Sequence, residues 1–376
     1  MSRVPFIHLA PKDRARTGIA SYADVLHQAL SKYAPSLDLT RVDASEFLAR
    51  LPAFPKGAIV WAELGVNEGE IFRALRVQKR LRPDFKRFIT IHDSPRFAHS
   101  PFRILETFGA SLPLRAARRA FNLAFEPLIL RQTLQADDEF VCLTSVGRDA
   151  LERRLRQSLR RAFKTHFIPH LLYLDEPLPV REKKQSDVAR IGFFGFITPN
   201  KGLGLLIDAA ILLKNSNKKT HIPFIAIRGK ATPQYLDYLN AQRAKVAEAD
   251  LSDRISFGDF LPDEALPQFF SEIDFLALPY DAPPVIAASG VLQWARTYGV
   301  PVIASETPAF ASLIESGKDG ILIPQGDATA WAKTLESIAT RNIAGDSFSE
   351  GIKARQAEAT WKKVAEMTLR ALDHRC

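Results

Sequence analysis

The sequence predicts an α/β protein made of two doubly wound domains. Short apolar runs alternate with longer segments of helical periodicity along all 376 residues, which is the pattern of βα units in parallel sheets. With 46% hydrophobic residues, the chain is long enough to bury two cores. A stretch rich in Pro, Glu and Lys at 174–185 interrupts the alternation. We therefore predict a first domain over 1–173, a linker over 174–188, a second domain over 189–348, and a C-terminal helix over 349–376 that could cross back to the first domain.

The first half of the chain opens with an apolar run at 4–9, predicted as a strand, and continues into a helical pattern at 19–31. In a helical pattern, apolar residues recur three and four positions apart, whereas a buried strand is a short apolar run. By these criteria a second helix is predicted at 70–81. Further strands are predicted at 58–61, 88–91, 140–143 and 167–168.

The second half is more regular, and it predicts a second doubly wound sheet. Its predicted strands cover 189–194, 224–228, 255–257, 275–279, 300–304 and 320–323. Helices are predicted from about 202 and at 233–248, 263–271, 290–298 and 328–339, with a last helical pattern at 349–372. Ligands of such sheets bind at the carboxyl ends of the strands, so the residues that follow strands are the candidates for function.

Composition says more about the cellular compartment of the protein than about its binding partner. The net charge of +9 implies attraction to an anion, which could be nucleic acid, an acidic membrane surface or a phosphorylated substrate. The only cysteines, Cys142 and Cys376, cannot form the disulfide framework of a secreted fold. No signal-like start and no apolar stretch of about 18 residues is present. We expect a cytoplasmic protein, either soluble or peripheral on the inner face of the cytoplasmic membrane.

Residues 191–202 combine a strand, a turn and a helix start with one lysine, Lys201. Backbone N–H groups at a helix N-terminus and a lysine charge would both stabilise a nucleotide diphosphate. Gly195 and Gly202 would permit close approach of the ligand. The alternative interpretation of this segment alone is a glycine turn with a solvated lysine.

Other segments follow or precede this one in a familiar order. Read together, they resemble glycosyltransferase family 4. The segments are 17–22 (Thr-Gly-Ile-Ala-Ser-Tyr), 91–93 (Ile-His-Asp), 168–170 (Ile-Pro-His), 258–262 (Gly-Asp-Phe-Leu-Pro), 274–280, 289–292 (Ser-Gly-Val-Leu) and 299–305. The resemblance implies a GT-B fold, in which two facing Rossmann-like domains enclose a cleft. It also implies a retaining transferase that moves a sugar from a nucleotide diphosphate without a metal or cofactor.

The resemblance implies catalytic roles for His92, Asp93 and Lys201. A metal-independent enzyme must neutralise the leaving diphosphate with cations and oriented amides, which suits Lys201 and a helix start at Ser289. His92 could bond the transferred sugar, with Asp93 orienting it, although a structural histidine is the alternative. Arg228 could contact phosphate or base, or be an ordinary strand-end arginine. The predicted donor-binding residues are Gly18, Ile19, Gly195, Lys201, Gly202, Arg228, Gly229, Leu261, Ser289, Gly290, Val291 and Leu292.

Three positions depart from the family pattern. The family usually carries two glutamates at the places occupied here by Ile286 and Trp294, and many members have an arginine at the place of Phe196. Ile286 and Trp294 are therefore predicted to contact ribose or sugar in a different way, with a core role as the alternative for Trp294. Two interpretations stay open: a divergent active enzyme, or a non-catalytic GT-B-like subunit that binds a sugar nucleotide or a glycan.

A basic segment at 148–164 surrounds an apolar stripe with arginines, and a second basic, apolar segment covers 112–134. Such helices could lie on an anionic membrane, which would suit a carbohydrate or lipid-linked acceptor in bacterial cell-envelope or exopolysaccharide synthesis. The alternative is a solvated helix whose stripe packs on its own domain. Nucleic acid is disfavoured because few aromatics are placed for stacking. Asp137, Asp138 and Glu139 precede their strand, so we predict a solvated cap there and no metal site.

Overall fold

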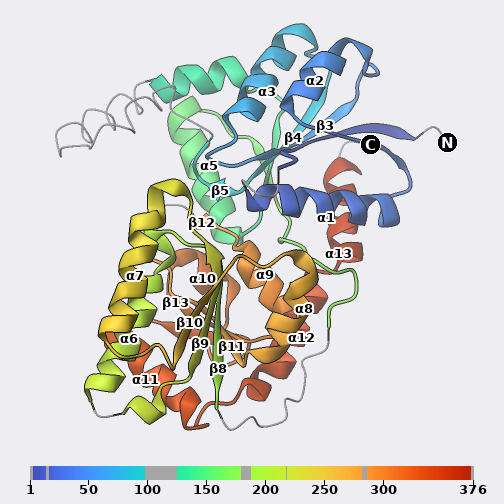
Figure 1. Ribbon diagram of the computed structural model, residues 1–376. Coiled ribbons are helices and arrows are strands. Elements are labelled where there is room, and N and C mark those ends of the chain that lie inside the picture. Colours follow the sequence, from blue (N-terminus) through green and yellow to red (C-terminus); the bar gives the residue numbers. More distant parts are fainter. Residues whose placement is uncertain are drawn as a thin grey trace. The chain divides into compact units, whose positions relative to one another are not determined.

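The structure is a computed structural model that describes residues 3–13, 17–97, 125–178, 188–216, 218–281 and 286–373 (Figure 1). The chain divides into two compact units. The N-terminal unit comprises Met1–Leu171, Val285–Ala288 and Trp361–Cys376, and the C-terminal unit comprises Leu172–Pro284 and Ser289–Thr360. Most of the predicted linker, Cys376 and the 112–124 part of the second basic segment lie outside the described residues.

The N-terminal unit contains a six-stranded parallel sheet with the strand order β2-β1-β3-β4-β6-β7. The strand at Leu37–Val42 was not predicted, because this edge strand is only half-buried and mixes polar with apolar residues. The other strands overlap the predicted runs. The strands are β1 (Val4–Leu9), β2 (Leu37–Val42), β3 (Ile59–Leu64), β4 (Lys86–Ile91), β6 (Glu139–Cys142) and β7 (Lys164–Phe167).

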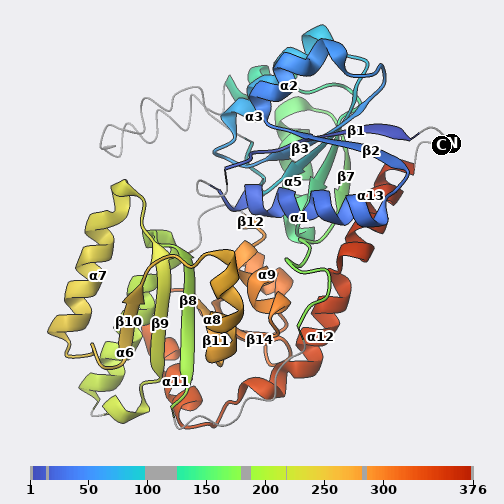
Figure 2. The ribbon, with the colours of Figure 1, turned by 45° about the vertical axis from the view of Figure 1, so that its right-hand side comes forward.

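Helices of this unit begin at identifiable caps. Thr17 Oγ1 accepts a hydrogen bond from the amide of Ile19 at 3.2 Å, and Asp43 and Glu46 form a capping box at the next helix. The last helix packs against the first, so chain ends that are far apart in sequence lie side by side (Figure 2). The helices are α1 (Gly18–Tyr33), α2 (Ala44–Arg50), α3 (Gly69–Leu81), the segment 125–133, α5 (Ser145–Leu159) and α13 (Trp361–Asp373).

The C-terminal unit contains a second six-stranded parallel sheet with the strand order β10-β9-β8-β11-β13-β14. Its strands are β8 (Arg190–Phe196), β9 (Phe224–Lys230), β10 (Ile255–Gly258), β11 (Phe275–Leu278), β13 (Val302–Ser305) and β14 (Gly320–Ile323). Its helices are α6 (Leu203–Asn215), α7 (Leu236–Glu248), α8 (Leu266–Glu272), α9 (Gly290–Thr297), α10 (Pro308–Leu313), α11 (Ala328–Ala339) and α12 (Ser349–Glu358). The prediction of two doubly wound parallel sheets is confirmed.

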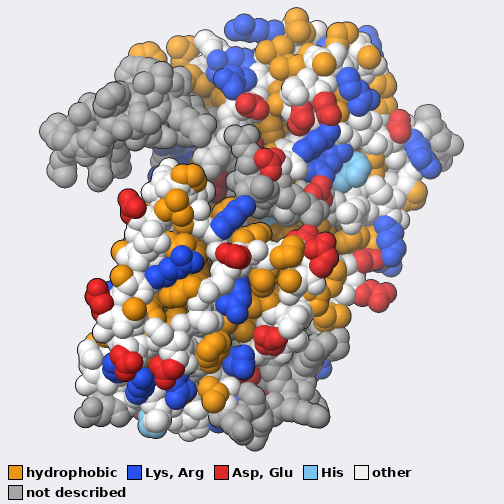
Figure 3. Space-filling model, in the orientation of Figure 1, with side chains coloured by type: hydrophobic (Ala, Val, Ile, Leu, Met, Phe, Trp, Pro, Cys, Tyr) orange, Lys and Arg blue, Asp and Glu red, His pale blue; other side chains and the backbone are white. Residues whose placement is uncertain are grey.

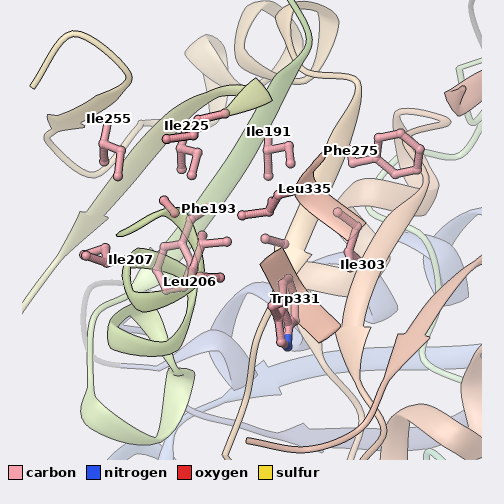
Figure 4. Close-up of a cluster of buried hydrophobic side chains, with 14 of the residues drawn as sticks. Ile191, Phe193, Leu206, Ile207, Ile225, Ile255, Phe275, Ile303, Trp331 and Leu335 are labelled. Carbon is pink, nitrogen blue, oxygen red and sulfur yellow. The ribbon is translucent and has the colours of Figure 1, made fainter. Parts of the chain in front are cut away.

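Helices cover both faces of the second sheet, which explains why its strands are continuous apolar runs. On one face, Trp331 and Leu335 of α11 and Leu206 of α6 pack against Phe193 and Ile225 of the sheet (Figure 4). On the opposite face, a second cluster gathers side chains of α8 and α9. Each fully buried side chain of this size stabilises the unit by ~1.5–3 kcal/mol.

Two short elements and one helix break were not predicted. The strand β5 (Asp93–Ser94) pairs antiparallel with β12 (Ile286–Ala287), so a short segment from the second half of the sequence belongs to the N-terminal unit. The helical pattern at 349–372 is divided between α12 and α13. The first of these helices belongs to the C-terminal unit and the second to the N-terminal unit.

Candidate functional site

The C-terminal unit holds Lys201 on a loop that is fastened to a second loop. Lys201 ends a short 3-10 helix, Pro199–Lys201, and its Nζ lies 3.8 Å from the centroid of the Tyr280 ring. The amide of Asp281 donates to the carbonyl of Asn200 at 3.0 Å. No carboxylate among the described residues pairs with Lys201. An ammonium group over an aromatic face keeps N–H donors available for an anion.

Gly202 has a packing reason to be glycine. Its φ of +71° lies in the left-handed region, and a Cβ at this position would lie 1.7 Å from the carbonyl oxygen of Pro279. The next glycine, Gly204, donates its amide to the hydroxyl of Tyr238 at 3.0 Å. One amide at the start of α6 therefore already has a protein partner.

The start of α9 has two backbone amides that donate hydrogen bonds to none of the described residues. Ser289 caps this helix, because its hydroxyl accepts from the amide of Leu292 at 3.3 Å. The amides of Gly290 and Val291 have no hydrogen-bond partner in the parts of the chain that the structure describes. Oriented amides at a helix N-terminus attract negative charge.

The structure brings three of the predicted donor residues together. Gly195 and Gly229 face each other in the β8–β9 ladder. A Cβ on Gly229 would lie 2.3 Å from the carbonyl oxygen of Gly195, and a Cβ on Gly195 would lie 3.2 Å from the side chain of Val291. Gly195 also has a φ of +116°. The backbones of the two strands therefore meet closely near their ends, with the side chain of Val291 from the first turn of α9 beside them, and a larger residue would not fit.

Arg228 and Leu261 are more closely tied to the unit itself. The guanidinium of Arg228 donates to the carbonyl of Ile227 at 3.0 Å and approaches the hydroxyl of Ser256 at 3.4 Å. Leu261 packs, partly buried, against the cluster of α8 and α9. These contacts agree with the strand-end alternative for Arg228, and a role of either residue toward a donor stays a prediction.

Trp294 has a protein partner where a ligand contact was predicted. Its ring stacks on Tyr173 with the centroids 3.9 Å apart and the planes at 8°, and Tyr298 lies near-parallel to it at 5.9 Å. The core alternative therefore describes Trp294 better than a stack on sugar or base does. The other replaced position, Ile286, lies in β12 opposite Ser94.

In the N-terminal unit, His92 directly follows β4 and is held by a residue that the sequence did not single out. Its Nε2 lies 2.8 Å from Oε2 of Glu63, a fully buried carboxylate next to the last residue of β3. Glu63 also accepts from Nε2 of His8 at 3.1 Å and from the indole N–H of Trp61 at 3.0 Å. Because Glu63 occupies Nε2, the nitrogen that His92 leaves available is Nδ1.

The hydrogen bonds and charges of this network change the pKa values of Glu63 and His27. Burial alone would raise the pKa of Glu63, but the hydrogen bonds from His8 and His92 and their charges hold that pKa at about 2, below its usual range. The ring of His27 stacks on His8 at 5.9 Å. Burial first, and then the charge of His8, lower the pKa of His27 to about 4. Glu63 is therefore ionised over the physiological pH range, and His27 is neutral.

Asp93 does not orient His92, contrary to our expectation. Its Oδ2 accepts from the amide of Val66 at 2.8 Å. A Cβ on Gly65 would lie 2.4 Å from the side chain of Ile19 and 3.0 Å from Oδ2 of Asp93. Asp93 thus fastens the loop after β3 and lies close to the predicted donor residue Ile19. A Cβ on its neighbour Gly18 would meet open space.

The acidic cap predicted at 137–139 is wrong for two of its residues. Asp138 is buried and forms a paired hydrogen bond with the buried Arg87, at 2.7 and 2.5 Å. Glu139 is buried beside His166 and Lys164, at 2.6 and 3.3 Å. The partners of both carboxylates lie on other strands, far away in the sequence. Local sequence therefore could not show that the two side chains are buried and paired.

The basic segment at 148–164 follows the packing alternative. Leu151 and Leu155 of its apolar stripe are buried in the core of the N-terminal unit, and Leu159 and Phe163 pack against the same core. Acidic partners neutralise some of its arginines, as in the pair of Arg154 with Glu126. On the face shown in Figure 3, basic and acidic side chains are interspersed. The stripe therefore packs on its own unit, and a membrane contact of the basic segment stays a prediction.

Membrane-spanning helices and metal-binding clusters are both absent from the described ranges. No helix there is both long enough and apolar enough to cross a bilayer. No group of three or more His, Cys, Asp or Glu side chains within those ranges is arranged to hold a metal ion.

Comparison with known proteins shows that part of the C-terminal unit is similar to a sequence family. Residues 188–341 match the family described as glycosyl transferases group 1. The chain is 31% identical over 146 residues to the amylovoran biosynthesis glycosyltransferase AmsK of Erwinia amylovora. The aligned region covers 37% of this chain and 33% of that protein. It is 28% identical over 144 residues to the lipopolysaccharide core biosynthesis mannosyltransferase LpsB of Rhizobium meliloti, covering 37% of this chain and 38% of that protein. These matches span less than half of either relative.

Solved structures match the whole chain. HepE of Anabaena, crystallised with UDP and glucose, aligns over 99% of this chain and 100% of its own with a TM-score of 0.67 at 15% identity. A sucrose-phosphate synthase from Thermosynechococcus elongatus aligns over 99% of both chains with a TM-score of 0.68 at 19% identity. At such identities the likeness establishes the fold alone. The chain therefore has the GT-B fold, with two Rossmann-like domains, and its second half matches the glycosyl transferases group 1 family.

Proposed function

We propose that this chain is a glycosyltransferase that moves a sugar from a nucleotide diphosphate to a carbohydrate or lipid-linked acceptor. The observation that carries the proposal is the Lys201 ammonium, which lies over the Tyr280 ring without a carboxylate partner in the described parts of the chain. The unpartnered amides at the start of α9 add a second source of positive potential in the same unit. A diphosphate matches both features.

The chemistry that these groups support is departure of the nucleoside diphosphate. As the bond between sugar and phosphate breaks, negative charge grows on the leaving oxygens, and oriented cations and amides stabilise that charge. We propose that Lys201 and the α9 amides perform this task without a metal ion, and that configuration at the sugar is retained. His92 would bond the transferred sugar through Nδ1, with Glu63 fixing its ring.

The acceptor and the pathway are proposed from the relatives. AmsK and LpsB are described as enzymes of amylovoran and lipopolysaccharide core biosynthesis. HepE was crystallised with UDP and glucose, which supports a sugar nucleotide as donor. We propose a role in bacterial cell-envelope or exopolysaccharide synthesis at the cytoplasmic side of the membrane.

A ligand screen followed by one substitution tests the proposal. Thermal unfolding with UDP, GDP, dTDP, ADP and CMP, and with the corresponding sugar nucleotides, identifies the donor, since a ligand at about 100 times its Kd stabilises by ~2.7 kcal/mol. With that donor, Lys201→Ala lowers the rate of sugar transfer or donor hydrolysis by ~10²–10³-fold, as expected when one stabilising group of the transition state is lost. Lys333→Ala, which changes an exposed lysine on α11, leaves the rate unchanged.

Two outcomes would contradict the proposal in different ways. A wild-type protein that binds a sugar nucleotide but turns over none, with any acceptor, would favour the non-catalytic binding subunit. Full activity of Lys201→Ala would remove this lysine from the reaction.

A further inference from the structure

A second lysine of the C-terminal unit lies over aromatic rings. Lys230 is the last residue of β9, directly opposite Phe196 at the end of β8. Its Nζ lies 5.3 Å from the centroid of the Phe196 ring and 5.2 Å from that of Phe260. The two rings stack on each other at 5.8 Å and 29°. We call Phe196, Lys230 and Phe260 the lysine–phenylalanine cluster.

The charge of Lys230 is not used by the fold. None of the residues that the structure describes offers a carboxylate to its ammonium, whereas other lysines of the unit, such as Lys218 and Lys245, pair with Glu336 and Asp208. Aromatic faces attract an ammonium without consuming its N–H donors. Phe260 keeps 37% of its surface exposed, so part of its ring faces solvent. The cluster therefore presents both a cation and a planar apolar surface.

The position of the cluster links it to the candidate donor site. Lys230 follows Gly229, whose backbone meets that of Gly195 at the strand ends, and Gly195 in turn contacts Val291 at the start of α9. Paired residues of parallel strands point to the same side of the sheet, so Lys230 shares the side of Phe196.

From these observations we propose that Lys230 supplies a second positive charge, in addition to that of Lys201, for the diphosphate of the bound nucleotide. The inference rests on the proposed function. The ligand class is a nucleoside diphosphate, because its phosphates need cations and its flat base suits an exposed aromatic face. The rings of Phe196 and Phe260 provide the surface that holds the lysine.

Calorimetric titration of UDP, GDP and ADP into variants of the full chain tests the inference. Lys230→Met keeps the apolar stem on the rings and removes the charge, and it raises the Kd of the preferred diphosphate roughly tenfold to a hundredfold. It also reduces the dependence of Kd on salt. Lys230→Arg restores affinity and salt dependence. Lys333→Met, with the same change of net charge, binds as the wild type does, and thermal unfolding confirms that each variant is folded.

The outcomes separate the inference from the function on which it rests. If the wild type binds a diphosphate and Lys230→Met binds it equally well, the inference is wrong and the proposed function stands. If the wild type binds none of the diphosphates, the proposed function fails, and the inference fails with it. A loss of affinity that Lys230→Arg does not restore would mean that the stem matters and the charge does not, which also overturns the inference.

Discussion

The N-terminal unit holds its candidate catalytic histidine through a buried carboxylate that accepts several hydrogen bonds. In the C-terminal unit, by contrast, the ammonium groups of the candidate donor site lie over aromatic rings. Glu63 accepts from His8, His92 and Trp61 inside the first sheet. Lys201 and Lys230 have only ring contacts for their ammonium groups within the described ranges.

The difference shows two ways of preparing a site. A buried polar network that is satisfied internally holds one side chain in one orientation. A cation without a protein partner is only weakly held and keeps its binding capacity for a ligand of opposite charge. Loss of a partner should therefore damage the N-terminal unit through its fold and its histidine, and the C-terminal unit through its ligand.

The largest expected effect concerns the buried ion pair of the N-terminal unit. Asp138→Asn leaves the guanidinium of Arg87 buried without its counter-charge, and we expect the free energy of unfolding to fall by ~3–5 kcal/mol. Urea unfolding followed by circular dichroism measures the change. The control is Asp149→Asn, which removes an exposed partner of Arg148 and should cost under ~1 kcal/mol. Equal losses for the two variants would mean that internal pairing is unimportant for this unit.

Glu63→Gln tests the orientation of His92. A glutamine has one acceptor oxygen and no charge for three donors, so we expect the rate of sugar transfer to fall ~10–100-fold while the Kd of the nucleoside diphosphate stays unchanged. Kinetics of transfer together with titration of the diphosphate separate the two quantities. Glu70→Gln, at an exposed position of α3, is the matched control. A weaker diphosphate affinity with a normal rate would contradict the division of tasks between the units.

Gly202→Ala tests whether the Lys201 loop depends on backbone shape. The left-handed φ and the contact with the carbonyl of Pro279 both oppose a side chain, and we expect a loss of stability of ~1–3 kcal/mol. Thermal unfolding measures it. Gly18→Ala is a stability control, because its new Cβ meets no atom within 4 Å. A Gly202→Ala protein as stable as the wild type would show that the loop of Lys201 can move away from the loop of Pro279 without cost.

The smallest expected effect is a pH dependence of the N-terminal unit. The pKa of His27 is lowered from 6.5 to about 4, so the native state favours the neutral ring. Its contribution to stability is complete above pH 6.5 and is lost as the pH falls toward 4. The pKa of Glu63 is lowered from 4.5 to about 2, so a further loss follows between these values. Unfolding experiments from pH 8 to 4 should show a smaller decline in the free energy of unfolding for His27→Gln than for the wild type. An identical decline would show that His27 does not cause the pH dependence.

Much of the fold follows from local patterns. Apolar runs predicted β1 and β4 and every strand of the second sheet, because buried parallel strands need apolar residues on both faces. Residues after strands, such as His92 and Lys201, could be chosen from the same rule. The edge strand β2 and the two-residue strands β5 and β12 were not predicted, because half-exposed or very short strands have no such apolar run.

The sequence by itself determined the two doubly wound sheets, the helix start at Ser289, the place of His92 directly after a strand, and the place of Lys201 in the turn between a strand and a helix. Only the tertiary structure decided the partners of these groups: Glu63 for His92, Tyr280 for Lys201, and Tyr173 for Trp294. The physical reason is range. Periodicity and capping depend on residues a few positions apart, whereas a hydrogen bond or a ring contact depends on which strands lie side by side, and those strands are far apart in the chain.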